Sequence, residues 1–227
     1  MKPSSTLRIK ICCINSVDEA RIVVECGASA IGLVSAMPSG PGVISEEMIA
    51  IIAATVPPGV SSFLLTSKQD ATFIIAQQHR CGTNAIQIVD SVPTHVYAEL
   101  RQALPGIALV QVIHVRGQES IEEANRVAPC VDALLLDSGN PELVVKELGG
   151  TGRTHNWAIS RMIRERVDVP VFLAGGLHAG NVGRAIAEVG PFGVDVCSGV
   201  RADGRLDERK LAEFFRAVSL TSQSRTV

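Results

Sequence analysis

Two side chains that could transfer protons stand at the ends of apolar runs in this 227-residue chain. Cys12 lies near the end of the run 8–13, and Asp137 closes the run 131–137. A thiol and a carboxyl that face one cleft could divide proton transfer between them, one as base and the other as acid. Each residue also has a plainer interpretation. Buried core cysteines are common, and an aspartate after a strand often caps the following turn.

Glycine-rich segments form a second group of candidates. They occupy residues 149–152, 175–176 and 198–199, in a long polar segment and directly after two later apolar runs. Glycine lets backbone amides approach an anion closely, and the loops after strands seven and eight of α/β barrels often bind phosphate. A single glycine pair is usually only a turn. Its repetition at two adjacent strand ends favours a phosphate site.

The elements that must position these residues are eight short apolar runs, separated by longer amphipathic stretches. The runs cover residues 8–13, 29–34, 60–65, 84–89, 107–115, 131–137, 169–174 and 192–197. Runs that are apolar almost throughout are typical of parallel strands buried on both faces. Eight such units could form an open doubly wound sheet. We predict instead one α/β domain over residues 1–227, a (β/α)8 TIM barrel with its core at about 8–218 and a polar tail at 219–227.

Composition narrows the class of partner. With 46% hydrophobic residues, 19% charged residues and a net charge of −2, the chain can bury a core but lacks a basic surface for nucleic acid or membrane lipids. It has no signal-peptide pattern and no apolar stretch long enough to span a bilayer, and none of its six cysteines forms a C-x-x-C pair. We therefore expect a small-molecule partner and a cytoplasmic location. Apolar residues on outer helices could mark a homodimer face.

Five short motifs follow one another between about residues 8 and 218. They are Lys10-Ile11-Cys12, Leu135-Leu136-Asp137, Gly149-Gly150-Thr151-Gly152-Arg153-Thr154 with Trp157, Ala174-Gly175-Gly176-Leu177 with Asn181, and Val194-Asp195-Val196-Cys197-Ser198-Gly199-Val200. In sequence, order and spacing they resemble the motifs of the phosphoribosylanthranilate isomerase family.

The resemblance implies an Amadori rearrangement in tryptophan biosynthesis, an aminoaldose-to-aminoketose isomerisation that uses neither a cofactor nor a metal. It implies that Asp137 is the general acid, that Cys12 is the general base, and that Asp195 faces the substrate. Without the resemblance, we would interpret Asp195 as an inward-pointing polar residue of the barrel floor. The implied phosphate-binding residues are Gly150, Gly152, Gly175, Gly176, Ser198 and Gly199.

The chain departs from the family pattern at the end that would hold the aromatic acid. Gly42 stands where the family usually has a carboxylate-binding arginine, Val89-Asp90 replaces a usual His-Gly pair, and Arg201 replaces a common glutamate. Arg201, His114 or Arg116 could supply another cation, although the sequence favours solvated loop charges for all three. We therefore expect weak activity on phosphoribosylanthranilate, raised by Gly42→Arg, because an arginine can bind a carboxylate through two hydrogen bonds.

Two alternatives remain open at this stage. The chain could perform the same chemistry on another phosphorylated amino-sugar, or it could be a non-catalytic barrel that binds a sugar phosphate. Binding alone requires neither a thiol nor a carboxyl at the two strand ends. The presence of both Cys12 and Asp137 therefore disfavours the non-catalytic alternative.

Overall fold

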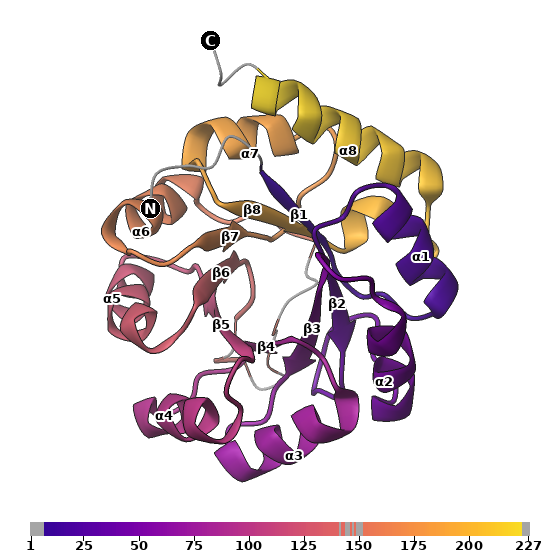
Figure 1. The fold of residues 1–227 in the computed structure, drawn as a ribbon. Helices are drawn as coiled ribbons and strands as arrows, with labels where there is room; N and C mark the ends of the chain where they lie inside the picture. Colours follow the sequence, from indigo (N-terminus) through magenta and orange to yellow (C-terminus); the bar gives the residue numbers. More distant parts are fainter. Residues whose placement is uncertain (1–6, 141, 144–145, 147, 149–151, 224–227) are drawn as a thin grey trace.

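Eight parallel strands close into a barrel in the computed structural model, which describes residues 7–140, 142–143, 146, 148 and 152–223 (Figure 1). The strands are β1 (Arg8–Ile11), β2 (Ala30–Val34), β3 (Ser61–Thr66), β4 (Ala85–Ile88), β5 (Ala108–His114), β6 (Ala133–Asp137), β7 (Val171–Leu173) and β8 (Gly193–Val196). The barrel closes where β1 pairs with β8, in a register that places Ile11 beside Val196. The predicted (β/α)8 barrel is confirmed.

A ring of helices surrounds the barrel. They are α1 (Val17–Glu25), α2 (Glu46–Thr55), α3 (Ala71–Cys81), α4 (Thr94–Ala103), α5 (Glu119–Val127), α6 (Trp157–Arg166), α7 (Val182–Val189) and α8 (Glu208–Gln223). Side-chain oxygens of Ser16, Ser45 and Asp70 accept backbone N–H groups in the first turns of α1, α2 and α3. These caps satisfy amides that have no partner inside a helix.

The chain after β8 differs from the prediction. A 3₁₀ turn (Ser198–Val200) leads into a short hairpin of β9 (Arg201–Ala202) and β10 (Arg205–Leu206), which the apolar pattern does not reveal. Residues 219–223, predicted as part of a polar tail, belong to α8. The helix persists because Leu211, Phe214 and Val218 are buried and anchor it to the barrel.

Two hydrophobic layers account for the stability of this arrangement. Alternate strand residues point outward and pack against the helices, while the others point inward and fill the barrel. Inside, the rings of Phe63 and Phe172 meet edge to face with centroids 6.2 Å apart. The inward residues nearest the C-terminal strand ends therefore share one enclosed space.

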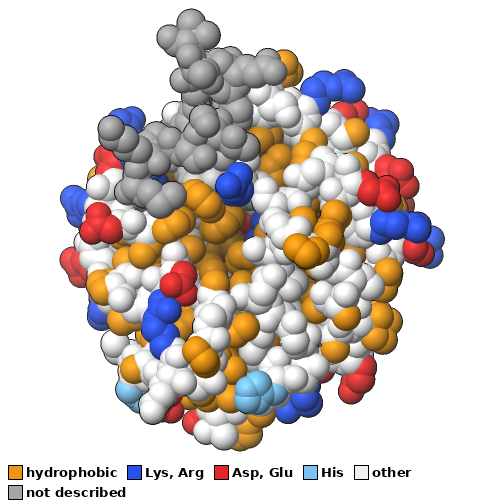
Figure 2. Space-filling model, in the orientation of Figure 1, with side chains coloured by type: hydrophobic (Ala, Val, Ile, Leu, Met, Phe, Trp, Pro, Cys, Tyr) orange, Lys and Arg blue, Asp and Glu red, His pale blue; other side chains and the backbone are white. Residues whose placement is uncertain are grey.

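The exterior shows basic and acidic side chains mixed around the rim, with hydrophobic side chains nearer the centre, on the face seen in Figure 2. Among the described residues, no helix is both long and apolar enough to cross a membrane.

Candidate active site

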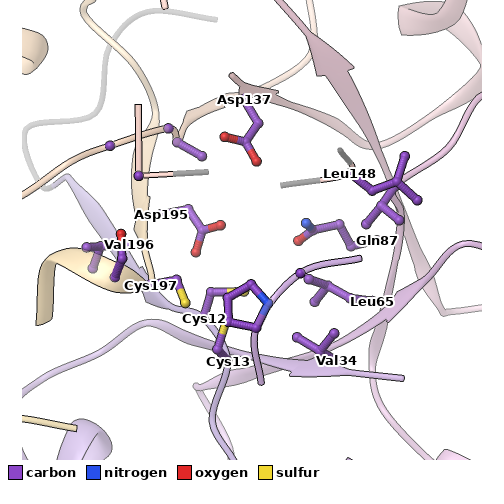
Figure 3. A pocket seen from close by; sticks show the side chains of 18 of the residues that line it. Cys12, Cys13, Val34, Leu65, Gln87, Asp137, Leu148, Asp195, Val196 and Cys197 are labelled. Atoms are coloured by element: carbon purple, nitrogen blue, oxygen red, sulfur yellow. The ribbon is translucent and has the colours of Figure 1, made fainter. Parts of the chain in front are cut away.

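A cavity of about 640 Å³, including the part open at its mouth, lies at the C-terminal ends of the strands. Cys12 from the end of β1 and Asp137 from β6 both line it, and Figure 3 shows them on opposite sides of the space. Residues 125 positions apart in the chain thus face one cavity, as the proton-transfer hypothesis requires.

The Cys12 thiol lies in an electrostatic setting that favours the thiolate. A hydrogen bond from the Cys13 thiol lowers the pKa of Cys12; burial opposes this, and the nearby positive charge of Lys10 adds to the lowering. The hydrogen bonds of Cys13 with Cys12 and Cys197, together with burial, raise the pKa of Cys13 instead. Of these two adjacent thiols, Cys12 therefore loses its proton more readily.

Lys10 and Asp195 form a buried ion pair below Cys12. Lys10 Nζ lies 3.0 Å from Asp195 Oδ1, and the two side chains are 0% and 7% exposed. Burial lowers the pKa of Lys10, but the charges of Asp195 and Cys12 outweigh it, so Lys10 stays charged. Asp195 also lines the cavity. It therefore fits both sequence interpretations, as an inward residue of the barrel floor and as a residue that faces the cavity.

Asp137 combines a structural contact with a free approach to the cavity. Its Oδ1 accepts the backbone N–H of Ser138 at 2.7 Å, which is the turn cap of the plainer interpretation. Gly175 lies next to Asp137 and has a φ of +81°. A Cβ added there would lie 3.2 Å from Asp137 Oδ1 and 3.0 Å from His155 Nδ1. Only glycine fits here without crowding these side chains.

The predicted phosphate-binding residues fall into three groups. Gly152, Gly175, Gly176 and Ser198 line the cavity together, so three loops converge there. Gly199 is not among the lining residues. It packs tightly against the loop after β7, because an added Cβ would meet the Leu177 carbonyl oxygen at 2.0 Å. Gly150 lies outside the described residues.

The opposite end of the cavity is largely apolar, with the side chain of Gln87 among its lining residues (Figure 3). Its wall is formed by Val34, Met37, Leu65, Val89 and Leu148. Among the described lining residues there is no lysine or arginine. This surface suits a flat apolar group such as an aromatic ring.

None of the three suggested replacement cations lines this cavity. Arg201 is buried and binds Glu19 at 2.8 Å and the Cys13 carbonyl, Arg116 pairs with Glu142, and His114 Nε2 contacts the Val89 carbonyl at 2.9 Å. The glutamate-to-arginine departure at residue 201 therefore has a structural role.

Gly42 cannot accept a side chain in its present conformation. Its φ is +76°, and an added Cβ would stand 2.5 Å from Cys13 Cβ and 2.9 Å from Cys13 Cα. Backbone and side chain would both have to move. This geometry opposes the expectation that Gly42→Arg raises activity, since the substitution would displace Cys13 beside the thiol of Cys12.

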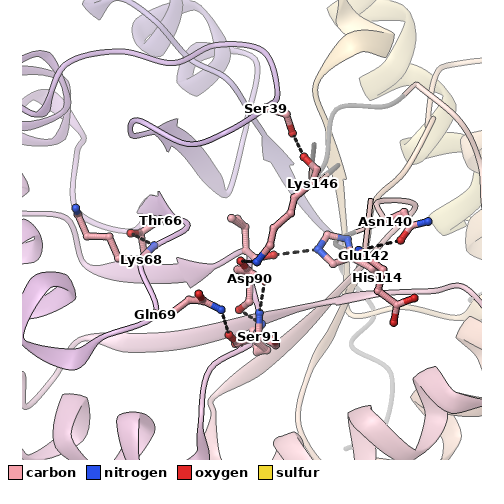
Figure 4. Close-up of polar contacts among 12 residues, drawn as sticks. Ser39, Thr66, Lys68, Gln69, Asp90, Ser91, His114, Asn140, Glu142 and Lys146 are labelled. Atoms are coloured by element: carbon pink, nitrogen blue, oxygen red, sulfur yellow. Dashed lines mark hydrogen bonds and ion pairs between the residues drawn. The ribbon is translucent and has the colours of Figure 1, made fainter. Parts of the chain in front are cut away.

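The long segment between β6 and α6 contributes contacts that the motifs do not predict. Lys146 forms an ion pair with Asp90, which follows β4, and its carbonyl accepts the Ser39 hydroxyl (Figure 4). These contacts fix Lys146, and two residues further on Leu148, 4% exposed, lies in the cavity wall. The length of the segment is the one sequence signal that pointed to it.

A metal site is a separate question. Among the described residues, no group of three or more His, Cys, Asp or Glu side chains is arranged to hold a metal ion.

Comparison with known proteins gives a consistent pattern. The family model described as N-(5'-phosphoribosyl)anthranilate isomerase matches residues 9–217. N-(5'-phosphoribosyl)anthranilate isomerase 2 of Methanosarcina mazei is 36% identical over 210 residues, which cover 92% of either chain.

Two solved structures are similar over 94% of this chain and 99% of their own. One is a phosphoribosyl anthranilate isomerase in complex with reduced 1-(o-carboxyphenylamino)-1-deoxyribulose 5-phosphate, 27% identical with a TM-score of 0.78. The other is described as monomers of the dimeric isomerase of Thermotoga maritima, 26% identical with a TM-score of 0.77.

Proposed function

The chain belongs to the N-(5'-phosphoribosyl)anthranilate isomerase family, and on that premise we propose that Cys12 and Asp137 carry the two proton transfers of its reaction. The enzyme converts an aminoaldose phosphate into an aminoketose phosphate in tryptophan biosynthesis. The observation that carries the proposal is the position of Cys12 and Asp137 on opposite sides of one cavity.

The first step requires an acid. Asp137 donates its proton to the furanose ring oxygen, the bond from that oxygen to C1 breaks, and the nitrogen lone pair forms an iminium with C1. Asp137 is left as a carboxylate, and the ring oxygen becomes the C4 hydroxyl. The backbone N–H of Ser138, which Asp137 already accepts, stabilises this carboxylate.

The second step requires a base. The Cys12 thiolate removes the proton from C2, and the electron pair of that C–H bond forms the C1–C2 double bond while the iminium is neutralised. The resulting enolamine tautomerises to the ketone. The lowered pKa of Cys12 supports this role, because a thiol that keeps its proton cannot act as a base.

The substrate lies with its phosphate at one end of the cavity and its aromatic ring at the other. The phosphate rests on backbone amides around Gly152, Gly175, Gly176 and Ser198, with Gly150 and Gly199 as further candidates from the same loops. The aromatic ring lies against the apolar wall that includes Leu65 and Val89. This orientation leaves the reacting carbons between Cys12 and Asp137.

A homodimer, which the sequence allows without predicting it, is also part of this proposal. It is supported by the similarity to the Thermotoga maritima enzyme, which is described as dimeric. Sedimentation equilibrium of the purified chain distinguishes a dimer from a monomer.

The test of the catalytic residues uses Asp137→Asn and Cys12→Ser. We expect each to lower kcat by roughly 100-fold or more, the usual scale for one positioned acid or base. Turnover is followed as the loss of anthranilate-type fluorescence. Cys26→Ser is the matched control, because Cys26 is exposed and lies outside the cavity, and it should retain full activity. Full activity in either active-site variant removes that residue from the mechanism.

A further inference from the structure

His155 stands next to Asp137 without a part in the mechanism so far. It directly precedes the N-cap of α6, at the end of the long segment after β6. Its Nε2 lies 2.7 Å from the Ser160 hydroxyl, and its Nδ1 is buried with no hydrogen-bond partner. An unpaired buried nitrogen is costly, so a partner in another state of the enzyme is the natural explanation.

The hydrogen bond to Ser160 fixes the tautomer of the ring. Ser160 is fully buried, and among the described residues its hydroxyl contacts only His155 Nε2. If Nε2 donated, the hydroxyl proton would have no acceptor. The hydroxyl therefore donates to Nε2, and the ring proton is on Nδ1. Burial lowers the pKa of His155 to about 4, so the ring is neutral at neutral pH.

The Nδ1 of His155 and Oδ1 of Asp137 both lie beside the backbone of Gly175. Nδ1 and Asp137 Oδ1 lie 3.0 and 3.2 Å from the point where a Cβ on residue 175 would stand, and glycine keeps that point open. The negative charge of Asp137 acts on the ring, raising the pKa of His155 against the effect of burial. The two side chains are thus electrostatic neighbours without a hydrogen bond between them in this structure.

We infer that His155 is a positioning residue for Asp137, whose Nδ1–H stabilises the carboxylate formed when Asp137 has given its proton to the ring oxygen. This inference rests on the proposed role of Asp137. Ser160 holds the imidazole in place, and His155 keeps its own proton throughout. The donor is most effective in the transition state, where charge develops on Asp137, so its removal lowers kcat more than it changes KM.

Ser138 already donates its backbone N–H and its hydroxyl to Asp137 Oδ1, at 2.7 and 3.4 Å, and further groups lie near Asp137. Asp195 on β8 is acidic and paired with Lys10, and His114 on β5 stands beside Asp137 in register with its Nε2 on the Val89 carbonyl. A pH profile of the enzyme therefore has to be compared between variants that leave these groups unchanged.

The test compares His155→Gln with His155→Asn. An asparagine amide can take the place of Nδ1–H, whereas a glutamine amide reaches the place of Nε2 and keeps only the Ser160 contact. We expect His155→Gln to lower kcat roughly 10-fold with little change in KM, the lower end for one hydrogen bond to a charged group. His155→Asn should recover most of that loss.

The pH profile distinguishes the proposed role from a purely structural one, which would leave the profile unchanged. Removing a donor to the carboxylate disfavours its charged form in the enzyme–substrate complex, so the high-pH fall of kcat should move to higher pH in His155→Gln. Wild-type kcat with an unmoved profile in His155→Gln overturns the inference, and so does an asparagine variant no better than glutamine. Asp137→Asn separates the two proposals: if it is fully active, the role of Asp137 itself fails.

Discussion

At the scale of single residues, the acidity of Cys12 depends on its neighbours in the chain and in space. Cys13 has a φ of +64°, an unusual backbone conformation for a residue with a side chain. That conformation lets its thiol donate to Cys12, the largest of the effects that lower the pKa of Cys12. An unusual backbone conformation thus stands beside the proposed base.

Cys13→Ala and Cys13→Ser test this dependence. Alanine keeps the Cβ and removes the donor, so the pKa of Cys12 rises. Because a base is active only when deprotonated, the low-pH rise of kcat/KM should move to higher pH, by up to about one unit. Serine retains a donor and should leave the profile near that of the wild type. Identical profiles in the alanine and serine variants would contradict this account of Cys12.

At the scale of elements, Lys146, in the segment between β6 and α6, forms an ion pair with the more deeply buried Asp90. Asp90 is 5% exposed and Lys146 37% exposed, and the Ser39 hydroxyl binds the Lys146 carbonyl. The pair links the segment to the end of β4, and the Ser39 contact links it to the loop after β2. These contacts fix the position of Lys146, two residues before Leu148 in the cavity wall.

Asp90→Asn and Lys146→Gln should each raise KM several-fold, because Leu148, two residues after Lys146, is then held less firmly in the apolar wall of the cavity. In the double variant the effects should not add, with a coupling of roughly 1 kcal/mol as is usual for residues in contact. Glu142→Gln is the control. It breaks the Arg116 pair on the same segment, where Glu142 is 71% exposed, and exposed pairs contribute little. Additive effects of Asp90 and Lys146 would show that the pair does not act as a unit.

The elements differ in how far the sequence predicts them. Strands were predictable because both faces are buried, so that apolar runs mark them directly. The hairpin of β9 and β10 was not, since each of its strands holds one arginine and one apolar residue and is too short to form an apolar run. The ion pair of Asp90 with Lys146 joins residues 56 positions apart and follows no periodic pattern. Cys12 and Asp137 could be proposed from their places at strand ends, whereas the tautomer of His155 requires the position of Ser160.

At the scale of the whole molecule, closure of the barrel joins the reactive groups. Cys12 follows the first strand and Asp195 lies on the last, and they meet only because β1 pairs with β8 (Figure 1). The buried pair of Lys10 and Asp195 bridges the same two strands. Loss of either partner would leave a charge buried without compensation, so folding and the electrostatics of the site are coupled at this seam.

Burial of His155 also links global stability to pH. Its pKa is 6.5 when unfolded and about 4 in the folded chain, because burial disfavours the charged ring. Between these values the unfolded chain binds more protons. The free energy of unfolding therefore falls as pH drops from about 6.5 towards 4, by at most roughly 3 kcal/mol from this group, at 1.36 kcal/mol per unit of pKa.

His155→Phe keeps a ring at this position and removes the titration. Urea unfolding of both proteins from pH 7.5 to 4.5 isolates the contribution of His155, because carboxylates such as Glu19, whose pKa is also lowered by Arg201 despite burial, are common to both. The stability of the wild type relative to the variant should be constant above about pH 7 and should decline steadily below it. Curves that stay parallel down to pH 4.5 would mean that His155 titrates alike in the folded and unfolded chains, and that its ring is not held neutral beside Asp137.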